Sequence, residues 1–125
     1  MEEKKKQIAI LGSTGSIGTQ ALEVISKHPS LFGVEVLTAN NNSSLLIEQA
    51  KKFKPNMVVI TNEEKYKEVD SALFSLGIKV FAGEQSLEEV VEGENIDIVL
   101  TALVGYSGLK PTIRAIKAKK NIALA

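Results

Sequence analysis

Three glycines spaced three residues apart separate an apolar run from a helical pattern near the start of the chain. Residues 7–11 form a short apolar run of the kind seen in buried strands, and from residue 16 to 26 the apolar side chains recur on one helical face. Gly12, Gly15 and Gly18 lie at this junction. In doubly wound α/β proteins, a glycine turn between the first strand and helix brings backbone close to phosphates. The spacing therefore predicts a fold built around a phosphate cradle.

The position of the glycine triplet gives it meaning, because the spacing alone is common in a chain with nine glycines. We expect Gly12 to turn the chain sharply, Gly15 to bring bare backbone close to a pyrophosphate, and Gly18 to let the helix pack on the strand. The alternative is an ordinary glycine-rich turn. Further contacts are expected from the helix dipole and from the first-turn N–H groups and hydroxyls of Thr14, Ser16 and Ile17.

Apolar β-branched runs and helical patterns alternate along the rest of the chain. Strands are expected at residues 34–39, 57–60, 78–81, 96–103 and 121–124. Expected helix starts are a cap at Asn42 or Ser43, capping boxes at Thr61 with Glu64 and at Ser86 with Glu89, and Pro111 in a first turn. Strands joined by helices require right-handed crossovers and a parallel sheet. The predicted fold class is α/β, a Rossmann-like doubly wound parallel sheet with helices on both faces.

The polar loop after the second expected strand bears on the choice of dinucleotide. Enzymes that use NAD usually place a carboxylate there to hold the ribose hydroxyls. This chain has Asn40, Asn41 and Asn42 followed by two serines, with neither a carboxylate nor an arginine. Three amides and two hydroxyls can donate to a 2′-phosphate, so the loop favours NADP. The loop also fits a simple helix cap, and both interpretations can hold together.

The segment after the fifth expected strand is rich in small residues. In this fold that edge faces the nicotinamide half of the cofactor. Ala102 and Gly105 are the candidate contacts, because small residues let a ring lie close to the backbone. A plain glycine turn into the next helix is the alternative.

Composition excludes several function classes. Fifteen basic residues balance fifteen acidic ones, which argues against nucleic-acid and anionic-membrane partners. The chain has no cysteine and a single histidine, so we expect no metal site and no catalytic residue within it. We expect one domain over residues 1–125, in a cytoplasmic protein.

Beyond these patterns, three segments resemble the 1-deoxy-D-xylulose 5-phosphate reductoisomerase family. They are Gly12-Ser13-Thr14-Gly15-Ser16-Ile17-Gly18-Thr19-Gln20, His28-Pro29-x-x-Phe32 and Ala102-x-Val104-Gly105-x-x-Gly108-Leu109-x-Pro111-Thr112. The resemblance extends over essentially the whole chain. It implies an enzyme that rearranges 1-deoxy-D-xylulose 5-phosphate and reduces the intermediate with NADPH, giving 2-C-methyl-D-erythritol 4-phosphate for isoprenoid synthesis by the non-mevalonate pathway.

The resemblance also implies where the cofactors bind. It places NADPH contacts at Thr14, Gly15, Ser16 and Ile17 and at residues 40–42. Many members carry Gly-Lys-Asn at the latter three, and only Asn42 matches that pattern. Mg²⁺ or Mn²⁺ polarises the substrate oxygens in the family, on ligands beyond residue 125. The chain is therefore expected to be the cofactor domain of a longer homodimeric enzyme, lacking the catalytic and C-terminal domains and inactive alone.

Two other function classes remain open from the residues themselves. One is a different dehydrogenase with a similar glycine loop, such as the aspartate semialdehyde group, which a catalytic cysteine further along would favour. The other is a nucleotide-sensing module without catalytic activity.

Overall fold

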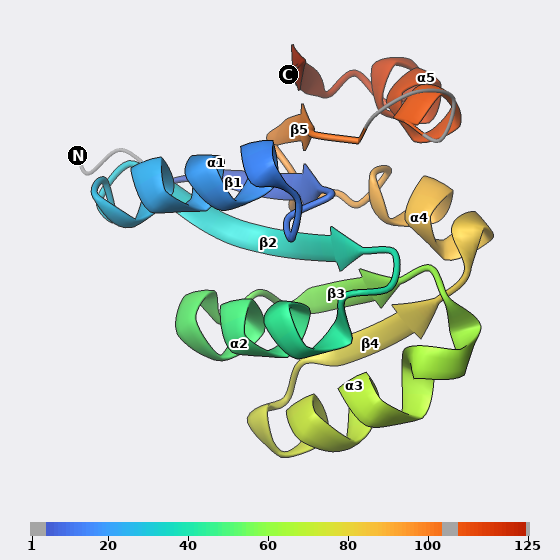
Figure 1. Ribbon diagram of the computed structural model, residues 1–125. Coiled ribbons are helices and arrows are strands. Elements are labelled where there is room, and N and C mark those ends of the chain that lie inside the picture. The colour runs from blue at the N-terminus through green and yellow to red at the C-terminus, as the bar shows by residue number, and fades with distance from the viewer. Residues whose placement is uncertain (1–4, 104–107, 125) are drawn as a thin grey trace.

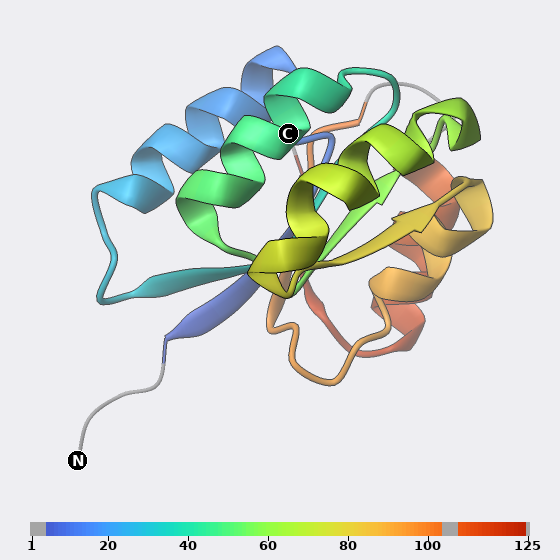
Figure 2. The same ribbon diagram turned by 90° about the horizontal axis from the view of Figure 1, so that it is seen from below.

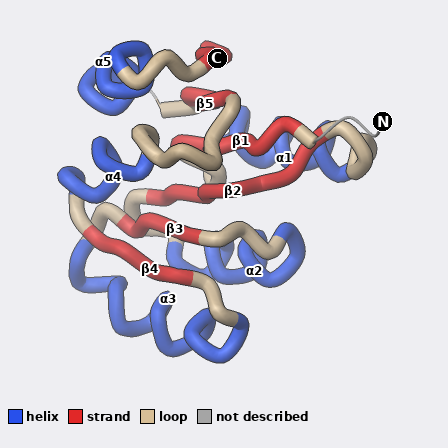
Figure 3. Tube along the Cα trace, turned by 180° about the vertical axis from the view of Figure 1, so that it is seen from behind, coloured by secondary structure: helices blue, strands red, loops and turns tan. Residues whose placement is uncertain are grey.

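A computed structural model describes residues 5–103 and 108–124 of the chain. Within these residues, six strands form one parallel sheet in the order β4-β3-β2-β1-β5-β6 (Figures 1 and 3). The strands are β1 Lys6–Leu11, β2 Phe32–Ala39, β3 Met57–Ile60, β4 Lys79–Ala82, β5 Ile98–Thr101 and β6 Asn121–Leu124. The helices are α1 Ser16–Ser26, α2 Ser43–Phe53, α3 Tyr66–Leu73, α4 Glu84–Val90 and α5 Leu109–Lys117, with 3₁₀ turns η1 Glu63–Lys65 and η2 Phe74–Leu76.

Helices cover both faces of the sheet, which Figure 2 shows from below. The buried side chains of α1, α2 and α3 pack with one face of the strands in the larger apolar core. Those of α4 and α5 pack on the opposite face in a second core. The predicted fold class, a Rossmann-like doubly wound parallel sheet, is confirmed.

The direction of winding reverses between β1 and β5. The chain moves outward from β1 to the edge strand β4, and α4 then returns it to β5 on the other side of β1. Ligands of open α/β sheets bind at such a switch point, outside the carboxyl ends of the strands. Topology therefore places the candidate site at the ends of β1, β2 and β5.

Local signals fixed some element boundaries correctly and misplaced others. Helix α1 spans the predicted residues, and the Asn42 side chain caps α2 by accepting from the Leu45 N–H at 3.2 Å. The two predicted capping boxes are wrong. Asn62, and not Thr61, caps the 3₁₀ turn that precedes α3. Helix α4 begins before Ser86, whose hydroxyl donates to the carbonyl of residue 82 at 2.8 Å.

A buried carboxylate occupies an irregular position in β2. The register of β1 on β2 shifts so that Ile8 faces Val34 while Ala9 faces Val36, which leaves Glu35 as the extra residue of a bulge. Glu35 is only 4% exposed and accepts a hydrogen bond from Asn56 Nδ2 at 2.8 Å. Burial raises the pKa of Glu35 above its ordinary value, and the bond from Asn56 opposes that rise.

Because the pKa of Glu35 is raised, we expect Glu35→Gln to increase the stability of the fold by an amount that depends on pH. The folded chain binds this proton more tightly than the unfolded chain does, so stability is highest below the unfolded pKa and falls as pH rises through the folded pKa. The amide still accepts from Asn56 and carries no charge. Urea titration should show the variant to be more stable than the unaltered chain at pH 7, with the difference shrinking toward pH 4. Glu48→Gln, at an exposed position of α2, should change stability at neither pH. Destabilisation by Glu35→Gln at pH 7 would contradict this account.

Candidate functional site

The glycine loop lies between β1 and α1 and closely approaches the segment that follows β5. Gly12 has a φ of +84°, a conformation that favours glycine. A Cβ on Gly12 would lie 3.0 Å from Leu103 Cδ2 and 3.2 Å from the Ala102 carbonyl oxygen. The fold thus brings together two of the sequence-predicted segments, the glycine loop and the one starting at Ala102. Gly105, the other candidate of that segment, lies outside the described residues.

A buried hydrogen-bond network holds the glycine loop from behind. The Gly12 N–H donates to Thr38 Oγ1 at 2.9 Å, and the Ser13 N–H donates to the Thr38 carbonyl at 2.8 Å. The Ser13 hydroxyl donates to Gln49 Oε1 at 2.8 Å, and Gln49 Nε2 returns a bond to the Ser13 carbonyl at 2.9 Å. These side chains are buried. The loop is therefore tied both to β2 and to α2.

The amino-acid sequence did not predict this network, although two of its members, Thr38 and Gln49, leave a signal. Thr38 is a polar residue near the end of an otherwise apolar strand, and Gln49 falls beside Ala50 on the inward face of α2. Ser13 gave no signal of its own, because a serine in a glycine loop is equally compatible with a ligand contact. In the structure Ser13 is fully buried and turns away from the open face.

The N-terminus of α1 is the open side of the loop. A Cβ on Gly18 would lie 2.2 Å from the Gly12 carbonyl oxygen, so only glycine lets the first turn lie this close to the loop. The helix cap is Gly15, which has no side chain to accept from the N–H groups of Ser16 and Ile17. Gly15, Ser16 and Ile17 are all exposed. First-turn N–H groups and the helix dipole therefore face a surface that an anion can reach.

The loop of three asparagines after β2 borders the same edge of the sheet. Thr61 Oγ1 donates to Asn40 Oδ1 at 2.6 Å, and Asn62 Nδ2 donates to Asn41 Oδ1 at 2.7 Å. Asn42 is turned toward α2, where its oxygen forms the helix cap. Asn42 therefore forms the predicted helix cap, whereas Asn40 and Asn41 are the residues of this loop that remain predicted donors.

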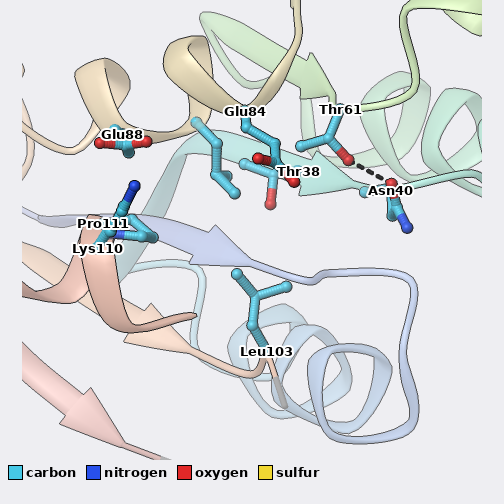
Figure 4. Close-up of a pocket in the computed structure, with 10 residues that line it drawn as sticks. Thr38, Asn40, Thr61, Glu84, Glu88, Leu103, Lys110 and Pro111 are labelled. Atoms are coloured by element: carbon cyan, nitrogen blue, oxygen red, sulfur yellow. Dashed lines mark hydrogen bonds between the residues drawn. The ribbon is translucent and has the colours of Figure 1, made fainter. Parts of the chain in front are cut away.

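A cavity of about 230 Å³ opens beside these loops (Figure 4). The ends of β2 and β3 contribute Thr38, Ala39, Asn40 and Thr61, while the segment after β5 contributes Leu103. The remaining lining residues come from the two helices on this face and were not predicted, namely Glu84, Leu87, Glu88, Lys110 and Pro111. The lining combines apolar side chains with hydroxyl, amide and charged groups, a mixture that suits small organic ligands. An anion cradle next to such a cavity suits a molecule with a phosphate chain and a flat organic group.

Other kinds of site receive no support from the described residues. Residues 5–103 and 108–124 contain no cluster of three or more His, Asp or Glu side chains able to hold a metal ion. None of the helices in this part of the chain is long and apolar enough to cross a membrane.

Comparison with known proteins adds an independent observation. Residues 8–125 match the family model for 1-deoxy-D-xylulose 5-phosphate reductoisomerase. The reductoisomerase of Bacteroides thetaiotaomicron is 63% identical over 124 residues, which cover 99% of this chain and 32% of that protein. The chain thus spans about a third of the length of such relatives.

Solved structures of reductoisomerases share the fold. The enzyme from Zymomonas mobilis in complex with NADPH superposes with a TM-score of 0.91 at 33% identity, covering 97% of this chain and 32% of that one. A second reductoisomerase, in complex with NADPH, fosmidomycin and magnesium, gives a TM-score of 0.88 at 31% identity, covering 94% of this chain and 29% of that one. The chain belongs to the 1-deoxy-D-xylulose 5-phosphate reductoisomerase family.

Proposed function

We propose that this chain is the NADPH-binding domain of an enzyme that rearranges 1-deoxy-D-xylulose 5-phosphate and reduces it to 2-C-methyl-D-erythritol 4-phosphate. The observation that carries the proposal is the exposed first turn of α1, capped by a glycine and tied from behind to β2 and α2. A related enzyme of the same fold is known in complex with NADPH. Family membership favours this function over an aspartate semialdehyde dehydrogenase or a nucleotide sensor.

The residues at the cradle fit a dinucleotide phosphate. Among the residues that the structure describes, a Cβ on Gly15 would touch only the Gly12 carbonyl oxygen, at 3.7 Å, which leaves space in front of Gly15 for a pyrophosphate. The N–H groups of Ser16 and Ile17 and the hydroxyls of Thr14 and Ser16 would hold its oxygens. We place the nicotinamide half near Ala102, which lies next to the glycine loop, and near Gly105.

The remaining chemistry is assigned to the parts of the enzyme that this chain does not cover. Bound NADPH supplies a hydride, and a divalent metal polarises the substrate oxygens. A related reductoisomerase binds magnesium. We propose that the ligands of that metal, and most groups that hold the sugar phosphate, follow residue 125. Turnover then requires both regions, because hydride transfer needs the substrate held against the nicotinamide.

Gly15→Val tests the cradle. The backbone at Gly15 has φ −77° and ψ 175°, which valine adopts readily, so the fold should survive at a cost of about 1 kcal/mol for the poorer helix cap. The branched side chain would fill the pyrophosphate position, and NADPH affinity should fall by about tenfold or more in calorimetric titrations. Gly15→Ala should give a smaller loss, and far-UV circular dichroism should be unchanged in both. Unaltered affinity in the valine variant would refute the cradle.

Asn40→Asp tests the choice of cofactor. We expect the unaltered chain to bind NADPH more tightly than NADH, because donors and no carboxylate surround the 2′-phosphate. Aspartate keeps the hydrogen bond from Thr61 but opposes the phosphate with a like charge. NADPH affinity should fall by about tenfold while NADH affinity holds or improves. Equal binding of both cofactors by the unaltered chain would show that the asparagine loop does not select NADPH.

A further inference from the structure

Two residues on the loop after β3 form hydrogen bonds with the asparagine loop after β2. The side chains of Thr61 and Asn62 donate to the amide oxygens of Asn40 and Asn41 at 2.6 and 2.7 Å. The backbone continues the same pairing, since the Thr61 N–H donates to the carbonyl of Ala39 at 2.9 Å and the Asn62 N–H to that of Asn40 at 3.0 Å. Side-chain and backbone hydrogen bonds thus join the two loops beyond the ends of their strands.

The orientation of the Asn41 amide follows from a chain of donors and acceptors. The backbone N–H of Glu64 donates to Asn62 Oδ1 at 3.0 Å, and a backbone N–H can only donate. The oxygen of Asn62 must therefore face Glu64, which leaves its Nδ2 to find an acceptor. Asn41 Oδ1 is that acceptor. The NH₂ group of Asn41 is consequently directed away from Asn62.

Thr61 contacts Asn40 in turn, but a hydroxyl can accept as well as donate, so the orientation of this amide is the one observed and is not dictated by Thr61. Its hydroxyl engages the amide oxygen, and Figure 4 shows the Asn40 nitrogen pointing away from Thr61. Both asparagines are exposed. The loop therefore presents two NH₂ groups outward, with both oxygens occupied.

This orientation matters because residues 38–44 contain no lysine, arginine or histidine. Phosphate oxygens at neutral pH are acceptors, so a loop without cations binds them only through correctly turned N–H and O–H groups. An amide turned the other way would present lone pairs to the phosphate.

We propose that Asn62, assisted by Thr61, is a positioning residue that turns the asparagine loop into a donor surface for the 2′-phosphate of the cofactor. This assignment rests on the proposed function, because it names what sets the preference for NADPH at that site. Asn62 acts through Asn41 and need not touch the cofactor itself.

Asn62→Asp tests the assignment with little risk to the fold. Aspartate still accepts from the Glu64 N–H, so the turn before α3 keeps its cap. Its second oxygen cannot donate, and the Asn41 amide must rotate to give it an NH₂ group. That rotation turns Asn41 Oδ1 outward. In titrations of this chain, NADPH affinity should fall by about tenfold while NADH affinity stays within about twofold.

A double-mutant cycle separates amide rotation from the added charge. Asn41→Ala removes the amide that rotates, so Asn62→Asp should then have little further effect on NADPH binding. An equal loss in both backgrounds would assign the effect to through-space repulsion and overturn the proposal. An equal loss for NADPH and NADH would make Asn62 merely structural and overturn it too.

Variants of Thr61 provide a second test of the proposal that involves no change of charge. Thr61→Val removes the hydroxyl and should lower the preference for NADPH over NADH, whereas Thr61→Ser should retain it. An unchanged preference in the valine variant would overturn the role of Thr61. If the unaltered chain binds neither cofactor, the proposed function fails, and this assignment fails with it.

Discussion

The candidate site depends on a buried polar contact made behind the glycine loop. Buried hydrogen bonds join Ser13 to Gln49 and the Gly12 N–H to the Thr38 hydroxyl. A polar group left without a partner in this interior would cost about 1–3 kcal/mol. A shift of the loop would break these hydrogen bonds and leave buried polar groups unpaired, which favours the position that the structure shows. The exposed backbone at Gly15 and the first turn of α1 acquire their direction from that position. Gly18 and Gly12 then allow the close contacts that join the loop to α1 and to Ala102.

The sequence predicted the layers of the fold because those depend on periodicity and on glycine. The span of α1, the parallel sheet and the place of the glycine loop all follow from patterns that act over many residues. Boundaries set by a single side chain were less predictable. Thr61 and Ser86 each begin a motif that suits a helix cap, yet the chain places the caps at Asn62 and Gly83 instead.

Sequence also left the inner supports of the site unseen. Ser13 and Thr14 are adjacent hydroxyl residues in the same loop, but only the fold shows that Ser13 is fully buried while Thr14 is partly exposed. Residues of α4 and α5 line part of the cavity. They are distant in sequence from the loop after β2 and meet it only in the folded chain. Arg114 of α5 contacts Glu88 of α4 at 3.7 Å and Glu92, which follows α4, at 2.8 Å. No spacing along the chain indicates such a contact.

The central claim is that first-turn N–H groups of α1 hold the pyrophosphate of NADPH. Amide chemical shifts in the ¹H–¹⁵N NMR spectrum, followed during titration with NADPH, test it most directly because they report on each N–H group separately. The account predicts that the largest changes fall on Gly15, Ser16 and Ile17, with a second group at Asn40 and Asn41. Saturating shifts at another surface, with residues 12–18 unaffected, would contradict it.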